Sequence, residues 1–132
     1  MIYLDTSAAA KVVLRERESL ALRGWLDGQA GPGVSSVITK IELTRAAARR
    51  GDSLVSDAER ALGRLALLDV SGDIVERACV VGRPHLRSLD AIHLATALRL
   101  AEDLTSFVTY DRQLGRAALD AELPVVSPGC EL

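Results

Sequence analysis

Short apolar runs alternate along the chain with longer segments in which apolar residues recur every three or four positions. The apolar runs are short enough for buried strands, and they cover residues 2–4, 34–38, 66–70, 106–109 and 124–127. The periodic segments predict helices, which cover residues 8–14, 19–27, 40–50, 54–65, 74–81, 89–101 and 112–119. Residues that favour helix N-caps precede four of these helices; they are Thr6 or Ser7, Thr39, Ser88 and Asp111.

This alternation of strands and helices predicts an α/β fold. Its central sheet is expected to be mostly parallel, with helices on both faces. Residues 1–132 contain no internal repeat and no low-complexity segment, and a chain of this length suits one domain. Right-handed crossovers would place the loops after the strands along one edge of the sheet, which is where ligands bind in such folds.

Four acidic residues follow the predicted strands. Asp5 ends the first strand, Glu42 is expected in the first turn of the helix after the second, Asp90 is in the first turn of the helix capped by Ser88, and Asp111 comes two residues after the fourth strand. The fold would bring these four acids to one edge, although they are far apart in the sequence.

Carboxylates gathered in this way repel one another and lose solvation unless a cation lies between them. Oxygen ligands without a neighbouring cysteine or histidine pair favour Mg²⁺ or Mn²⁺ over zinc. Such an ion can polarise a phosphodiester and activate a water molecule, so the sequence predicts a phosphodiesterase. Each acid taken alone has a simpler reading, because acids are favoured in first helical turns by capping and by the helix dipole.

The charge of the chain changes with this interpretation. The formal net charge is −2, but removing four site acids leaves 16 basic against 14 acidic residues. Arginine supplies most of the basic residues, and its guanidinium matches phosphate oxygens. Candidate contacts with an RNA backbone near the predicted edge are Lys11, Arg15, Arg45, Arg49, Arg87 and Arg112.

Composition also bears on location. Cys79 and Cys130 have no metal-binding spacing and are interpreted as reduced thiols, with Cys79 packed in a helix. The N-terminal segment is not that of a secretory signal, and no apolar run is long enough to cross a bilayer. We therefore expect a cytoplasmic protein without a membrane partner.

Four segments of the chain resemble the motifs of PIN-domain ribonucleases of the VapC toxin type. They are IYLDTS, VSSVITKIELTRA, SLDAIHLATA and FVTYDRQL, in the order and spacing of that family, so the resemblance covers essentially the whole chain. It implies a PIN domain over residues 1–132 that hydrolyses RNA with Mg²⁺, for which Mn²⁺ can substitute, and leaves a 5′-phosphate and a 3′-hydroxyl. Substrates in the family include tRNA and ribosomal RNA.

Carried over by position, the resemblance makes Asp5, Glu42, Asp90 and Asp111 the metal-binding catalytic acids. Asp5, Asp90 and Asp111 would hold the metal, and Glu42 would orient or deprotonate the attacking water. Ser7 would hold Asp5 by a hydrogen bond, and Thr109 would help order the site near Asp111. The family further implies a homodimer and a cognate VapB-type antitoxin, for which the apolar face around Trp25 is one candidate contact; that face also suits the core or the dimer.

Other functions remain as alternatives. A receiver-like phosphoacceptor domain or a dehalogenase-like phosphatase would need a second acid near Asp5, which this chain lacks. A housekeeping RNA-processing nuclease would share the chemistry, and a non-catalytic α/β partner domain would share only the fold. His93 lies three residues after Asp90 and is interpreted as a packed core histidine rather than a general base, with contact to the site left open. His85 is expected to be solvated.

Overall fold

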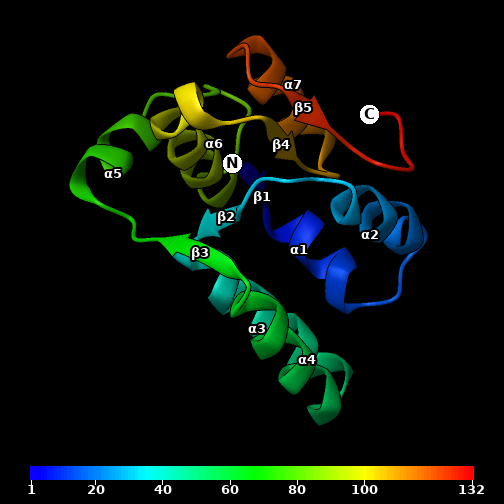
Figure 1. The fold of residues 1–132 in the computed structure, drawn as a ribbon. Coiled ribbons are helices and arrows are strands. Elements are labelled where there is room, and N and C mark those ends of the chain that lie inside the picture. The colour runs from blue at the N-terminus through cyan, green and yellow to red at the C-terminus, as the bar shows by residue number, and fades with distance from the viewer.

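The computed structural model describes all 132 residues and contains a five-stranded sheet in which every pairing is parallel (Figure 1). The strands are β1 (Ile2–Leu4), β2 (Gly33–Ser36), β3 (Leu65–Leu68), β4 (Ser106–Val108) and β5 (Val125–Val126). The helices are α1 (Thr6–Val13), α2 (Ser19–Asp27), α3 (Val37–Arg50), α4 (Asp52–Leu62), α5 (Gly72–Ala78), α6 (Ser88–Arg99) and α7 (Arg112–Asp120), with a 3₁₀ turn at Ala101–Asp103. The predicted parallel α/β fold is confirmed.

The order of the strands determines where the sheet can bind a ligand. It is β3-β2-β1-β4-β5, so the chain first builds outward from β1 to one side and later returns to add β4 and β5 on the other. The direction of the connections therefore reverses between β1 and β4. In open parallel sheets this switch point leaves a crevice outside the carboxyl ends of the two strands.

Helices cover both faces of the sheet, as expected. Successive residues of a strand point to opposite faces. Tyr3 accordingly joins the core formed with α6 and α7, whereas Ile2 and Leu4 pack on the other side with α1 and α2. A third apolar cluster joins α1 to the α3–α4 hairpin, which projects from the sheet in Figure 1. In the α2 face, Leu22 is fully buried and Trp25 packs at its edge.

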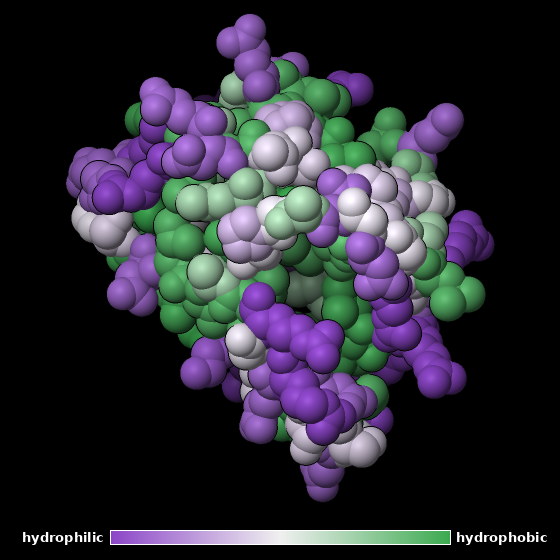
Figure 2. Space-filling view, in the orientation of Figure 1, coloured by the Kyte–Doolittle hydropathy of each residue, from purple (hydrophilic) through white to green (hydrophobic).

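An apolar cavity of about 630 Å³ lies where α1 and α2 diverge from α4 and β3. Leu4, Val12, Leu26 and Leu65 contribute to its lining. Figure 2 looks onto this region, where apolar side chains flank a hollow near the middle of the face. No helix of the structure has the length and apolar character that crossing a membrane requires.

Three predicted N-caps were wrong. Ser36, not Thr39, caps α3 and accepts a hydrogen bond from the Ile38 backbone N–H, so residues 37 and 38 are helical and not part of the strand. Asp5 caps α1 by accepting from the Ala8 N–H, so Thr6 and Ser7 belong to the helix. Arg87 occupies the cap of α6, and Ser88 is its first helical residue. Only Asp111 takes its predicted role, at the start of α7.

One consequence concerns the candidate site. Because α3 begins at Val37, Glu42 lies in its second turn rather than its first. Its position therefore cannot be attributed to N-terminal capping. The two cysteines are free, as expected, but Cys79 is exposed at the end of α5 and is not packed within a helix.

Candidate active site

The switch point of the sheet carries two of the predicted site acids. Asp5 directly follows β1, and its backbone N–H donates to the carbonyl of Val108 at the end of β4 (3.2 Å). Asp111 follows β4 and caps α7 by accepting from the Leu114 N–H (2.8 Å). Both acids therefore lie at the carboxyl ends of β1 and β4, the two neighbouring strands between which the direction of the connections reverses.

Asp5 is almost completely buried, with 2% of its surface exposed. Its Oδ1 accepts from the Ala8 N–H (2.9 Å) and its Oδ2 from the Thr109 hydroxyl (2.6 Å), while Ser7 Oγ lies 2.7 and 2.9 Å from the two oxygens. Burial raises the pKa of the Asp5 carboxyl above its ordinary value, and the nearby His93 ring and these hydrogen bonds offset only part of that rise. The structure thus holds a carboxylate where solvation is poor.

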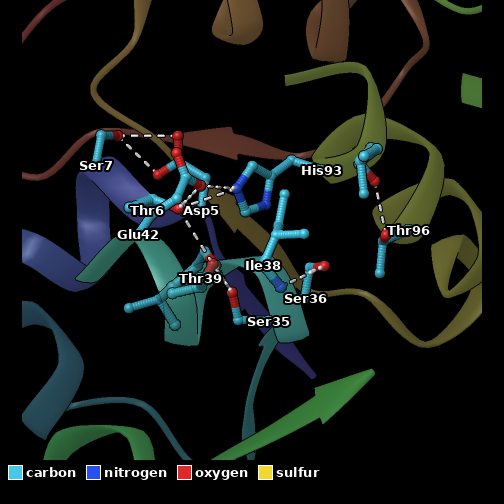
Figure 3. Close-up of polar contacts among 12 residues, drawn as sticks. Asp5, Thr6, Ser7, Ser35, Ser36, Ile38, Thr39, Glu42, His93 and Thr96 are labelled. Atoms are coloured by element: carbon cyan, nitrogen blue, oxygen red, sulfur yellow. Dashed lines mark hydrogen bonds and ion pairs between the residues drawn. The ribbon is translucent and has the colours of Figure 1, made fainter. Parts of the chain in front are cut away.

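Glu42 reaches the same region from α3. Its Oε1 accepts a hydrogen bond from the Thr6 hydroxyl (2.6 Å) and lies 3.6 Å from His93 Nε2 (Figure 3). The pKa of Glu42 is lowered, chiefly by its interaction with His93 and further by the bond from Thr6, against a smaller effect of burial. Glu42 is consequently ionised at neutral pH, whereas burial makes ionisation of Asp5 costly.

Asp90 links the set electrostatically. It is half-buried in the first turn of α6, and burial is the main cause of its raised pKa. The negative charges of Asp111, Asp5 and Glu42 each raise it further, in that order. His93 opposes this rise in the pKa of Asp90. The structure therefore brings Asp111, Asp5 and Glu42 within electrostatic range of Asp90.

The donor chemistry suits a hard divalent cation. All four groups are carboxylates, and the unfavourable charge at Asp90 is what a bound cation would relieve. The side chains nevertheless do not converge on one point, since no three Asp, Glu, His or Cys residues are placed to hold a single ion. The residues fit such an ion by charge and ligand type, and binding it would require the side chains to draw together.

The predicted RNA contacts differ in their surroundings. Lys11 pairs with Glu18 (2.8 Å) and Glu16 (3.6 Å) and lies over the Tyr110 ring, so its charge is already engaged. The other candidates are exposed and form no ion pair; they are Arg15, Arg45, Arg49, Arg87 and Arg112. Arg45 does not pair with Glu42.

Three further side chains at the site were not selected from the sequence. Thr6 bonds Glu42, His93 bonds Thr6, and the Tyr3 hydroxyl lies 2.7 Å from His93 Nδ1. His93 is a buried core histidine, as expected, but it also contacts the site, whereas His85 is exposed. The available signal was position: Thr6 directly follows Asp5, and His93 lies one helical turn after Asp90.

Comparison with known proteins shows similarity over nearly the whole chain. The family model described as PIN domain matches residues 2–119. The chain is 40% identical over 135 residues to Ribonuclease VapC47 of Mycobacterium tuberculosis strain CDC 1551 / Oshkosh, with 98% of each protein covered. Ribonuclease VapC46 of strain H37Rv is 42% identical over 127 residues, which cover 96% of this chain and 97% of that protein.

Solved structures are similar as well. A toxin–antitoxin complex from Klebsiella pneumoniae contains a chain with a TM-score of 0.74 and 25% identity, and the match covers 100% of both chains. The crystal structure of Mycobacterium tuberculosis VapC20, described as a sarcin-ricin loop cleaving toxin, has a TM-score of 0.77 at 18% identity and covers 97% of this chain and 100% of that one. Sequence, family model and fold thus agree, and the chain belongs to the PIN-domain family, among proteins of the VapC type.

Proposed function

We propose that this chain, acting as a single domain over residues 1–132, is a divalent-metal-dependent endoribonuclease and the toxin of a type II toxin–antitoxin pair. The observation that carries the proposal is the placement of Asp5 and Asp111 at the switch point of the sheet, with Glu42 on α3 and Asp90 on α6 close enough for their charges to act on the same region. Its VapC-type relatives are named ribonucleases, which supports the same activity here.

Each acid has a distinct part in this proposal. Asp5, Asp90 and Asp111 would hold Mg²⁺, or Mn²⁺ in its place. The bound ion supplies charge neutralisation at the phosphate and lowers the pKa of a bound water. Glu42 is ionised and accepts a proton from the attacking water. The water oxygen bonds to phosphorus as the bond to the 3′ oxygen breaks; a proton passes to that oxygen, so the products are a 5′-phosphate and a 3′-hydroxyl.

The substrate and partners follow from the family. We propose structured RNA, a tRNA or a ribosomal RNA loop, as the substrate, with exposed arginines such as Arg49 and Arg112 against its backbone. A VapB-type antitoxin is the proposed inhibitor, and several structurally similar chains were solved in toxin–antitoxin complexes, including one from Rickettsia felis. A homodimer and a cytoplasmic location complete the proposal.

A cleavage assay with a metal series tests the activity. Purified protein is incubated with total tRNA and ribosomal RNA in Mg²⁺, Mn²⁺ or excess EDTA, beside an Asp90→Asn variant that keeps the size of the side chain. We expect discrete cuts with either ion, none with EDTA, and none with the variant. Equal cleavage by Asp90→Asn would refute the assignment of Asp90 to the metal site. No cleavage by the wild-type protein on any of these RNAs would favour a non-catalytic partner domain.

The toxin assignment needs a separate experiment. Induced expression should arrest growth, and co-expression of the cognate antitoxin, which we expect a short reading frame upstream to encode, should relieve the arrest. Sequencing the 5′ ends of cellular RNA during the arrest would give the target and the cut site. Cleavage without growth arrest would instead favour a housekeeping RNA-processing nuclease.

A further inference from the structure

We propose that Tyr3, His93 and Thr6 form a directional hydrogen-bond chain that positions Glu42 for its part in catalysis. The proposal rests on the function proposed above and assigns positioning roles to three residues that do not themselves hold the metal. The contacts are Tyr3 Oη to His93 Nδ1 (2.7 Å), His93 Nε2 to Thr6 Oγ1 (3.1 Å) and Thr6 Oγ1 to Glu42 Oε1 (2.6 Å).

The direction of the chain follows from the protons available. An ionised carboxylate can only accept, so the single hydroxyl proton of Thr6 points to Glu42. Thr6 Oγ1 must then accept from His93, which requires a proton on Nε2. With that proton on Nε2, the neutral ring has Nδ1 free as an acceptor, and the Tyr3 hydroxyl 2.7 Å away donates to it. The Thr39 hydroxyl, 3.3 Å from Thr6 Oγ1, can donate to the same oxygen, and the hydrogen-bond chain ends at the carboxylate of Glu42.

The surroundings make this chain rigid. Tyr3 and His93 are 0% and 2% exposed, and the Tyr3 ring stacks on Phe107 with centroids 5.3 Å apart. The His93 ring meets Tyr3 edge-on, at 79° and 5.9 Å. Figure 3 shows His93 extending from α6 toward Thr6 and Glu42, which come from α1 and α3. Groups from the core of the sheet thus determine where a half-exposed acid on a helix lies.

The adjacent hydroxyls of Thr6 and Ser7 each donate a hydrogen bond to a different site acid. Ser7 bonds Asp5, and Thr6 bonds Glu42. Only Oε1 of Glu42 is engaged by protein groups, which leaves Oε2 for a water molecule or an ion. Holding one oxygen while leaving the other free is the arrangement expected of a carboxylate that must act in a defined position.

Substitutions at Thr6 test the chain with matched side chains. Thr6→Val keeps the shape and removes the hydroxyl, whereas Thr6→Ser keeps the hydroxyl and removes the methyl. Loss of such a supporting bond is expected to lower kcat by about 10- to 100-fold. KM for RNA should change by less than about threefold, because the step affected is chemical and not binding. Thr6→Ser should recover most of kcat, and His93→Gln, which retains a donor, should exceed His93→Leu.

Nitrogen NMR of metal-free protein gives a readout that does not depend on activity. The chain has two histidines, and exposed His85 serves as an internal reference. We expect the His93 ring to carry its proton on Nε2, with Nδ1 as an acceptor, and expect Tyr3→Phe to shift the Nδ1 resonance while His85 stays unchanged. Thermal unfolding of each variant identifies any that fails to fold. If the Tyr3 or His93 variants do not fold, the comparison of Thr6→Val with Thr6→Ser tests the proposal by itself.

Several results would refute the proposed hydrogen-bond chain from Tyr3 to Glu42. They are wild-type kcat in Thr6→Val, equal losses in Thr6→Val and Thr6→Ser, or a His93 ring protonated only on Nδ1. Failure of the nuclease proposal would look different, because the wild-type protein itself would then cleave no RNA. In that case the NMR experiment still determines whether the Tyr3–His93–Thr6 chain exists.

Discussion

Replacing Asp5 by asparagine should separate the catalytic value of this carboxylate from its cost to the fold. Asparagine keeps an oxygen that can accept from the Ala8 N–H and from Ser7, although its amide nitrogen cannot accept from Thr109. It also removes the charge of a residue of which only 2% is exposed. In metal-free protein at pH 7 we expect the free energy of unfolding to equal or exceed that of the wild type. RNA cleavage should fall by at least about 100-fold, the upper end of the loss from removing a residue that only supports a metal ligand.

Alanine at the same position provides the matched comparison. It removes the N-cap of α1, which costs about 1 kcal/mol. The Thr109 hydroxyl loses its acceptor in both variants, because the amide nitrogen of asparagine cannot accept, so this loss does not separate them. We therefore expect Asp5→Ala to be about 1 kcal/mol less stable than Asp5→Asn, which is the contribution of the cap. Both variants should be equally inactive.

The pH dependence supplies the decisive measurement. The pKa of Asp5 is raised in the folded protein above its ordinary value of 3.8, so the folded state binds the proton more tightly than the unfolded state. The contribution of Asp5 to stability is therefore fully present below that ordinary value and is lost as the pH rises through the folded pKa. Urea unfolding in EDTA should show the advantage of Asp5→Asn growing from pH 4 to pH 7. An advantage that is absent or constant over this range would refute the assignment of burial as the dominant effect.

The remaining predictions concern the helix ends, the RNA-facing surface and the core. Asp111→Asn should keep its capping bond to α7 and lose cleavage, whereas Asp111→Ala should also lose about 1 kcal/mol of stability by urea unfolding. Arg49→Ala, which removes an unpaired charge, should weaken RNA binding and flatten its salt dependence, whereas Lys11→Met should leave the salt slope unchanged because Lys11 is paired with acids. Leu43→Ala, at a fully buried position in the cluster of α1, α3 and α4, should cost about 2–5 kcal/mol. Ile41→Ala, on the exposed face of the same helix, should change the unfolding free energy by less than about 0.5 kcal/mol.

The sequence predicts most of the fold because strand and helix periodicities are distinct over most of the chain. It fails at the start of α3, where Val37 and Ile38 extend an apolar, β-branched run and read as strand. The Ser36 side chain caps the helix there, and tertiary packing overrides local preference. A similar limit applies at α1, where an acid expected only as a ligand is also the cap.

The candidate site also has a part that the sequence could indicate and a part that it could not. Acids after strands could be selected because parallel strands end at one edge, and Asp5 and Asp111 do lie at that edge, after β1 and β4. The hydrogen bonds of Thr6 to Glu42 and of His93 to Tyr3 span 36 and 90 positions in the sequence. Nothing in a local pattern indicates contacts over such distances, since they depend on how helices from both faces meet the sheet.

The pairing of β1 with β4 affects how the protein is made. Asp5 and Thr109, which share a hydrogen bond, are 104 positions apart, so the ribosome must release most of the chain before they can meet. Strand β1 lies between β2 and β4, so it cannot complete its pairing until β4 has been synthesised. Contacts between residues so far apart in the sequence form slowly. A nascent chain therefore has an incomplete set of site acids until residues 109–111 have left the ribosome, and an RNA-cutting site can be assembled only after that point.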